Sequence, residues 1–275
     1  MAISANAVAL TSATAATDLI DGFETLRISD ALGGDLTMAN VQDGLSTLRL
    51  DAGGTNRTVT MEAGAQSLDL RAAVTTAITV NDTGTATTDS LTITNNAAAT
   101  DLFATANLAT GGFETVTFNT SGTGVATSQD FGTIALAADL GGTSTLNLVG
   151  SNSVTTTGAI TAGTIDASGL TGTAVLTMGA AAVGVTTITG GLGADTLMGD
   201  ASSTINGGAG NDAITGGTGN DTLNGGAGND TITIDTGNDT VDGGAGNDTV
   251  VLTATDASAN DVVSGGEGTD ILTLA

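Results

Sequence analysis

The stretch GGAGNDTIT, residues 225–233, is one copy of a nine-residue unit that fills the last third of the chain, residues 190–273. Regular copies also begin at Gly190, Gly207, Gly216, Gly243 and Gly265. Three imperfect copies lie between them, at Gly199, at Ile234 and in an expanded unit whose tail is residues 260–264. The shared template is G-G-x-G-x-D-x-U-x, in which U is aliphatic, and it decides the fold of this region.

Each position of the template has a physical reason. Glycine at positions one, two and four allows the backbone to turn through positive φ without a Cβ clash. Aspartate at position six supplies the hard oxygen ligand that calcium prefers. The last three residues are too few for a helical turn but suit a short strand with U pointing inward. Two units therefore predict one coil of a parallel β-roll, with turns that alternate between two edges.

Counting the copies assigns the acidic residues to the two edges. The spacings from Asp195 to Asp212 and from Asp248 to Asp270 are 17 and 22 residues, instead of the regular 18. Both irregularities fall in units of the opposite edge, so the first edge keeps its register. The first edge is predicted to stack Asp195, Asp212, Asp230, Asp248 and Asp270, and the second edge Asp221, Asp239 and Asp261.

The array resembles the calcium-binding nonapeptide repeats of RTX proteins. The resemblance implies several Ca²⁺ ions, each between neighbouring turns of one edge. Its ligands would be two aspartates, the carbonyl groups at positions one and three of one turn, and those at positions two and four of the next. For the pair Asp212 and Asp230, the implied carbonyl groups are those of Gly207, Ala209, Gly226 and Gly228.

Four complete sites are expected on the first edge. The second edge is weaker, because the Ile234 copy lacks the leading glycines and the Gly199 copy lacks its acid. The full set of implied backbone positions is Gly190, Leu192, Gly207, Gly208, Ala209, Gly210, Gly216, Thr218, Gly225, Gly226, Ala227, Gly228, Gly243, Gly244, Ala245, Gly246, Gly266 and Gly268.

The stacked acids predict that calcium drives folding. Unit charges about 5 Å apart repel by roughly 3 kcal/mol at an effective dielectric constant near 20. Short strands that bury one aliphatic side chain each are not expected to overcome that repulsion. Calcium removes it and adds ligand bonds, so binding and folding of residues 190–273 should be one event.

Upstream, short alternating runs separated by Gly, Asn, Asp and Thr predict strands and turns. The run GFETLRI at Gly22 recurs as GFETVTF at Gly112, and STLRL at Ser46 recurs as STLNL at Ser144. This self-similarity favours stacked solenoid rungs over a β-sandwich, which is the competing fold. The best helical candidate, residues 101–109, is short and poorly patterned.

We therefore predict an all-β chain, in which a right-handed parallel β-solenoid continues into a calcium-binding RTX β-roll. Residues 1–20 would form an N-terminal edge strand or linker. Residues 21–189 would form a Thr/Ala-rich β-solenoid that carries assembly contacts, and residues 190–275 the roll.

The motif GFETL, the stretch DASGLTGTAVLT at residues 166–177 and the following GGLGADTL are similar to the C-terminal half of RTX-type S-layer proteins of Caulobacter-like bacteria. That resemblance implies a secreted, calcium-dependent surface protein that assembles with itself into a lattice or filament. A cell-surface polysaccharide would be bound through a separate region. It also implies type I secretion, and residues 270–275 look like the tip of such a signal while also completing the ninth unit. The alternatives are an RTX adhesin or biofilm-matrix module, or the detached module of a secreted enzyme.

Composition narrows the possible functions. A net charge of −25 with no Lys argues against nucleic acid as a partner. No apolar run reaches the roughly 18 residues that span a bilayer, and residues 1–10 lack the positive charge of a Sec signal. With no His, Cys, Lys or Tyr the usual catalytic bases and nucleophiles are missing, so we expect no enzyme.

The four arginines, Arg27, Arg49, Arg57 and Arg71, all lie in the first quarter of the chain. They are either solvated charges paired with nearby acids or a basic region that meets an acidic neighbouring subunit or an anionic glycan. Arg27 and Arg49 occupy similar places in their strands and are expected to align on one face.

Overall fold

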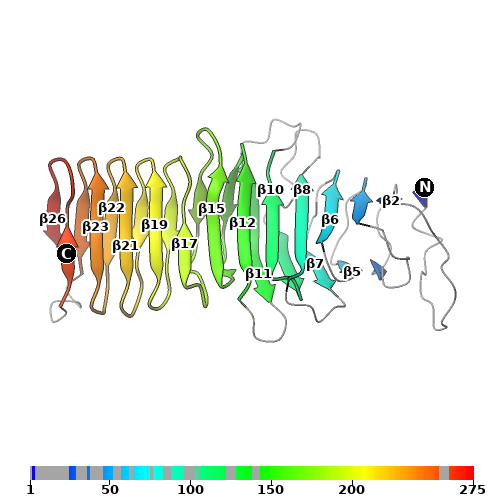
Figure 1. Cartoon of the computed structure of the whole chain (residues 1–275), viewed down its shortest axis with the longest axis horizontal. Helices are drawn as coiled ribbons and strands as arrows, with labels where there is room; N and C mark the ends of the chain where they lie inside the picture. The colour runs from blue at the N-terminus through cyan, green and yellow to red at the C-terminus, as the bar shows by residue number, and fades with distance from the viewer. Residues whose placement is uncertain are drawn as a thin grey trace. The chain divides into compact units, whose positions relative to one another are not determined.

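The structure is a computed structural model in which every regular element of the described residues is a β-strand (Figure 1). The chain divides into two compact units, Met1–Ser144 and Thr145–Ala275. The structure describes residues 2–3, 25–28, 36–37, 46–51, 57–61, 65–72, 74, 77–82, 88–95, 103, 106–121, 128–137, 143–253 and 260–275.

In the first unit, strands alternate between two parallel sheets. One sheet has the order β1-β2-β4-β6-β8-β10 and the other β3-β5-β7-β9-β11. The strands are β1 (Ala2–Ile3), β2 (Thr25–Ile28), β3 (Leu36–Thr37), β4 (Thr47–Leu50), β5 (Arg57–Met61), β6 (Ala65–Leu70), β7 (Ala77–Asp82), β8 (Ser90–Asn95), β9 (Ala106–Gly111), β10 (Thr115–Asn119) and β11 (Ser128–Ala137). Of the expected segment 1–20, only β1 lies within the described residues.

The second unit repeats this arrangement. Its two rows of parallel strands are β12-β15-β17-β19-β21-β23-β25 and β13-β16-β18-β20-β22-β24-β26. The strands are β12 (Thr145–Gly150), β13 (Ser153–Thr156), β14 (Ile160–Thr161), β15 (Thr164–Leu170), β16 (Leu176–Met178), β17 (Thr187–Thr189), β18 (Thr196–Met198), β19 (Thr204–Ala209), β20 (Ala213–Thr215), β21 (Thr222–Ala227), β22 (Thr231–Ile234), β23 (Thr240–Ala245), β24 (Thr249–Leu252), β25 (Val262–Ser264) and β26 (Ile271–Leu274).

Parallel pairing of strands that are not adjacent in sequence is the mark of a β-solenoid, and it rules out the β-sandwich. The change of pattern at residue 190 does not interrupt the sheets, because β17 pairs with β15 on one side and with β19 on the other. The solenoid therefore continues into the roll, as predicted.

Alternating side chains build the core of each unit from in-register columns. In the first unit Leu68 lies between Leu48 and Ile93, and all three are fully buried. In the second unit Ile205 pairs with Ile188 and Leu223, again with almost no exposure. Most short strands of the roll bury one aliphatic residue, whereas β22 buries two and the last two strands, β25 and β26, bury none, so the core is thin.

Three phenylalanines form the densest part of the core in the first unit. The ring centroids of Phe103 and Phe131 are 4.3 Å apart, and Phe118 meets Phe131 edge to face at 5.0 Å. All three are fully buried, so they fill the core and present no platform to a sugar. Residues 106–111 form β9, which overrides the slight helical pattern of residues 101–109.

Replacing Phe131 with Ala should lower the free energy of unfolding by about 3–5 kcal/mol, because the cavity between two rings cannot close. Urea denaturation followed by circular dichroism measures the change. Phe131→Leu keeps most of the volume and should cost much less. Equal small losses for both variants would contradict the packing described here.

Candidate metal centre

The turns of the roll lie at the ends of the short strands, where the glycines let successive coils stack closely. Gly226 and Gly228 have φ of 104° and 134°. A Cβ at Gly226 would lie 2.1 Å from the carbonyl oxygen of Gly208, and one at Gly228 would lie 1.7 Å from that of Gly210. Any larger residue at these two positions would force the coils apart.

Carbonyl groups alternate in direction along each turn. Those of Gly208 and Gly210 point forward to the next coil, as the close approaches just given show. The carbonyl groups at positions one and three point back to the preceding coil. The Gly225 oxygen lies 2.4 Å from the point where a Cβ of Gly207 would be. The Ala227 oxygen accepts a 2.8 Å hydrogen bond from the Gly210 N–H. The gap between the turn that begins at Gly207 and the turn that begins at Gly225 is therefore lined by carbonyl groups. They come from positions two and four of the first turn and from positions one and three of the second.

The pairing of carbonyl groups expected from the resemblance is therefore wrong in its direction. The oxygen of Gly207 faces the preceding turn at Gly190, and the oxygen of Gly226 faces the following turn at Gly244. Alternate carbonyl groups of a parallel strand point to opposite neighbours. Which neighbour each one meets depends on the orientation of the coil, and the template does not contain that information.

The first edge carries the predicted column of aspartates. The backbone N–H of each aspartate donates to Oδ1 of the aspartate one coil further on: Asp195 to Asp212 at 2.7 Å, Asp212 to Asp230 at 2.7 Å, Asp230 to Asp248 at 2.8 Å and Asp248 to Asp270 at 3.0 Å. The 17- and 22-residue spacings do not interrupt this ladder.

The second edge has the same ladder, and its first member is a serine. Ser203 N–H donates to Asp221 Oδ1 at 2.6 Å, Asp221 to Asp239 at 2.8 Å, and Asp239 to Asp261 at 2.9 Å. Ser203 thus occupies the acid position of the short copy. Its neighbour Ser202 adopts a φ of 49°, which absorbs the missing residue.

The second carboxylate oxygen of the aspartates points to a metal. Oδ2 of Asp212, Asp230 and Asp248 is buried and has no hydrogen-bond partner among the described residues. The point where a Cβ of Gly207 would lie is 2.4 Å from Asp212 Oδ2 and 2.4 Å from the Gly225 oxygen. A buried carboxylate oxygen without a donor, close to a backbone carbonyl oxygen, is unfavourable unless a cation lies nearby, so this set of oxygen atoms fits a hard ion such as Ca²⁺.

The composition of the gap limits the ligand set. Among the described residues, no three or more acidic side chains gather at one point. Each gap offers two carboxylates and several carbonyl oxygens, and Ca²⁺ takes six to eight oxygen ligands. Backbone groups would therefore supply most of the coordination, which explains why glycine is required beside the acids.

Burial also makes these carboxylates hard to ionise. It raises the pKa of Asp195, Asp221 and Asp230 above the usual value. For Asp212, burial and the neighbouring carboxylates of Asp195 and Asp230 raise the pKa to about 7, although the hydrogen bond from the Asp195 backbone opposes the shift. With its pKa at about 7, Asp212 is therefore partly protonated near neutral pH in the metal-free roll.

The asparagines at position five form ladders of their own, which were not predicted from the template. Asn229 N–H donates to Asn211 Oδ1 at 2.8 Å, and Asn247 N–H to Asn229 Oδ1 at 2.7 Å. On the other edge Asn238 N–H donates to Asn220 Oδ1 at 2.9 Å. The signal was present, because Asn precedes Asp in most copies of the template.

The RTX calcium-binding nonapeptide repeat family model matches this region in four copies, at residues 187–203, 199–232, 235–256 and 253–274. Repeats of this kind bind calcium in general. No curated protein and no solved structure matches the chain. The C-terminal part of the solenoid is thus an array of RTX repeats, and calcium is the metal that its turns fit.

Acidification should order the metal-free roll. The pKa of Asp212 is about 7 in the folded roll and near 3.8 when unfolded, so its contribution to stability is complete below pH 3.8 and is lost as the pH rises through about 7. In chelator, amide protection of residues 204–252, corrected for intrinsic exchange and measured by hydrogen exchange, should rise between pH 7.5 and 4.5. Asp212→Asn should show a smaller rise, and equal rises in both proteins would contradict this cause.

Asp230→Asn should weaken calcium binding in the two gaps that Asp230 borders by at least about 100-fold, because it replaces a charged carboxylate ligand with a neutral amide. A calcium titration of the whole chain by calorimetry measures the change. Asp242→Asn is the matched control, since Asp242 is exposed on β23. Identical titrations for the two variants would rule out the assigned ladder as the binding site.

Proposed function

We propose that the chain is a secreted structural protein whose roll folds on binding calcium and which assembles with itself into a surface lattice or filament of the S-layer kind. The observation that carries this proposal is the column of buried carboxylates whose Oδ2 atoms have no donor. A protein that builds such a column needs calcium to be folded at neutral pH.

The proposed calcium-dependent folding follows from the geometry of the aspartate ladders. Oδ1 accepts a hydrogen bond from the backbone of the preceding coil, so these bonds set the register and leave Oδ2 of Asp212 and Asp230 available to a metal. The metal would supply positive charge to Oδ2, and the chain would supply carboxylate and carbonyl oxygens. Folding would then follow the calcium concentration, which is low in cytoplasm and near millimolar outside the cell.

Secretion is consistent with the repeats. RTX repeats are typical of proteins secreted by type I systems. No helix in the described part of the chain is long and apolar enough to cross a membrane. A chain that stays extended until it meets external calcium suits export in an unfolded state, and we propose that route here.

A structural role is supported by the outer faces of the second unit. Thr187, Thr204, Thr222 and Thr240 form one in-register column on a parallel sheet. Such a regular column of hydroxyl side chains offers lateral contacts to another copy. The chain also lacks His, Cys, Lys and Tyr, so we propose that it has no catalytic activity of its own.

Electron microscopy of the purified chain before and after adding calcium tests the proposed assembly. Ordered sheets or fibres that form in calcium and disperse in chelator are the expected result. Monodisperse rods in calcium would instead favour the adhesin or matrix module. A β-sheet circular dichroism signal from the roll that is complete in chelator at pH 7.5 would overturn the folding switch, whichever particles form.

A further inference from the structure

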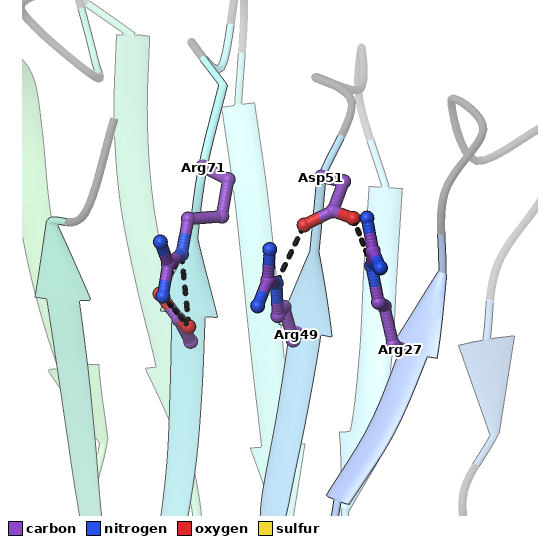
Figure 2. Close-up of polar contacts among 5 residues, drawn as sticks. Arg27, Arg49, Asp51 and Arg71 are labelled. Atoms are coloured by element: carbon purple, nitrogen blue, oxygen red, sulfur yellow. Dashed lines mark hydrogen bonds and ion pairs between the residues drawn. The ribbon is translucent and has the colours of Figure 1, made fainter. Parts of the chain in front are cut away.

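Arginines of the first unit line up on the outer face of one sheet (Figure 2). Arg27 on β2 is in register with Arg49 on β4, as the sequence predicts, and Arg49 is in register with Asp69 on β6. Arg49 points away from the core, because Leu48 and Leu50 on either side of it are buried. Adjacent strands lie about 4.8 Å apart, so the two arginine side chains run beside each other.

One carboxylate holds both arginines in place. Arg27 Nε donates to Asp51 Oδ2, and Arg49 Nε donates to Asp51 Oδ1 at 2.6 Å. The hydrogen bond from Arg49, with that from Arg27, holds the pKa of Asp51 below its usual value. Asp51 is therefore charged at neutral pH and orients two guanidinium groups at once.

Arg71 is bound differently. Its Nε donates to both oxygens of Asp69, at 3.0 and 3.1 Å, and its Nη2 lies 3.0 Å from Asp69 Oδ2 (Figure 2). Arg27 and Arg49 use only Nε, and no acceptor within the described ranges meets their Nη groups. Their side chains are 50% and 31% exposed. Arg27 and Arg49 thus present oriented Nη groups that can donate to another partner, whereas Nε and Nη2 of Arg71 already contact Asp69.

Charge is segregated along the chain. Two arginines that share one aspartate leave an excess positive charge in a protein of net charge −25. There is no Lys, and after Arg71 the chain contains acids but no cation. The second unit exposes several of these acids, at Asp200, Asp242, Glu267 and Asp270.

We propose that the Arg27–Arg49 pair docks onto exposed carboxylates of the second unit of another copy of this chain. The inference rests on the proposed self-assembly and specifies which two surfaces of neighbouring copies meet. A contact between two acidic surfaces would bring like charges together, whereas this contact joins opposite charges. Open guanidinium Nη groups bind carboxylates through paired hydrogen bonds. Because two different surfaces meet, the contact is heterologous and can extend into a row of copies.

Assembly of the full chain in calcium, followed by light scattering, is the first test. Arg27→Gln with Arg49→Gln should raise the concentration needed for assembly about tenfold, since two exposed ion pairs are lost. Arg71→Gln is the matched control and should change it little. Arg27→Lys with Arg49→Lys keeps the charge and should restore part of the effect, and circular dichroism checks that each variant folds.

A cross-linking test identifies the partner surface. Because the chain has no Lys, Arg49→Lys introduces its one side-chain amine, which a carbodiimide couples to a carboxylate in contact. In a mixture of isotopically light and heavy copies, mass spectrometry should find links between copies that end on acids of residues 145–275. Arg71→Lys, beside Asp69, should give links within one copy.

The outcomes separate this inference from the proposed function. If the natural chain assembles in calcium and the double Gln variant assembles equally well, the docking inference is wrong and self-assembly stands. Links between copies that end only on acids before residue 145 would also overturn it. If the natural chain does not assemble at all, the proposed function fails and the inference fails with it.

Discussion

The roll depends on stacking carboxylates inside a β-structure without letting them repel one another. Six aspartates of the two ladders are at most 3% exposed, and consecutive members are joined through one oxygen only. The core offers little to offset this, because most short strands of the roll bury only one aliphatic side chain, worth about 1.5–3 kcal/mol. A buried charge costs more than that unless it is paired, which is why we propose that a cation or protons stabilise the fold of this region.

The atoms that set the register of the coils differ from the atoms whose negative charge must be compensated. Asp Oδ1 accepts from the coil before it, while Asn Oδ1 accepts from the coil after it, so adjacent turns are held from both directions. Neither ladder involves Oδ2, which remains available to a metal at Asp212 and Asp230. The hydrogen bonds of the backbone and amide groups therefore align the coils, and the Oδ2 atoms of Asp212 and Asp230 are the groups that a metal would stabilise.

The first unit achieves the same architecture by other means. A cluster of three phenylalanines fills its core, where strands of the roll such as β20 and β21 bury single aliphatic residues. On its outer face Arg27 and Arg49 share Asp51. The roll thus buries a column of acids between its coils, whereas the first unit displays a pair of cations on one sheet.

The sequence by itself determined the parallel solenoid, the two edges and the order of acids along each edge. A strict nine-residue period leaves one way to stack Asp195, Asp212 and Asp230 in a column, and the irregular copies could be counted. It also indicated that Arg27 and Arg49 align. The tertiary structure decided which carbonyl groups face which gap, because that depends on coil orientation and not on spacing. It alone showed that Ser203 continues the second ladder and that position-five asparagines form their own. These features arise from contacts between residues 17 or more apart, and they become visible only when the coils are stacked.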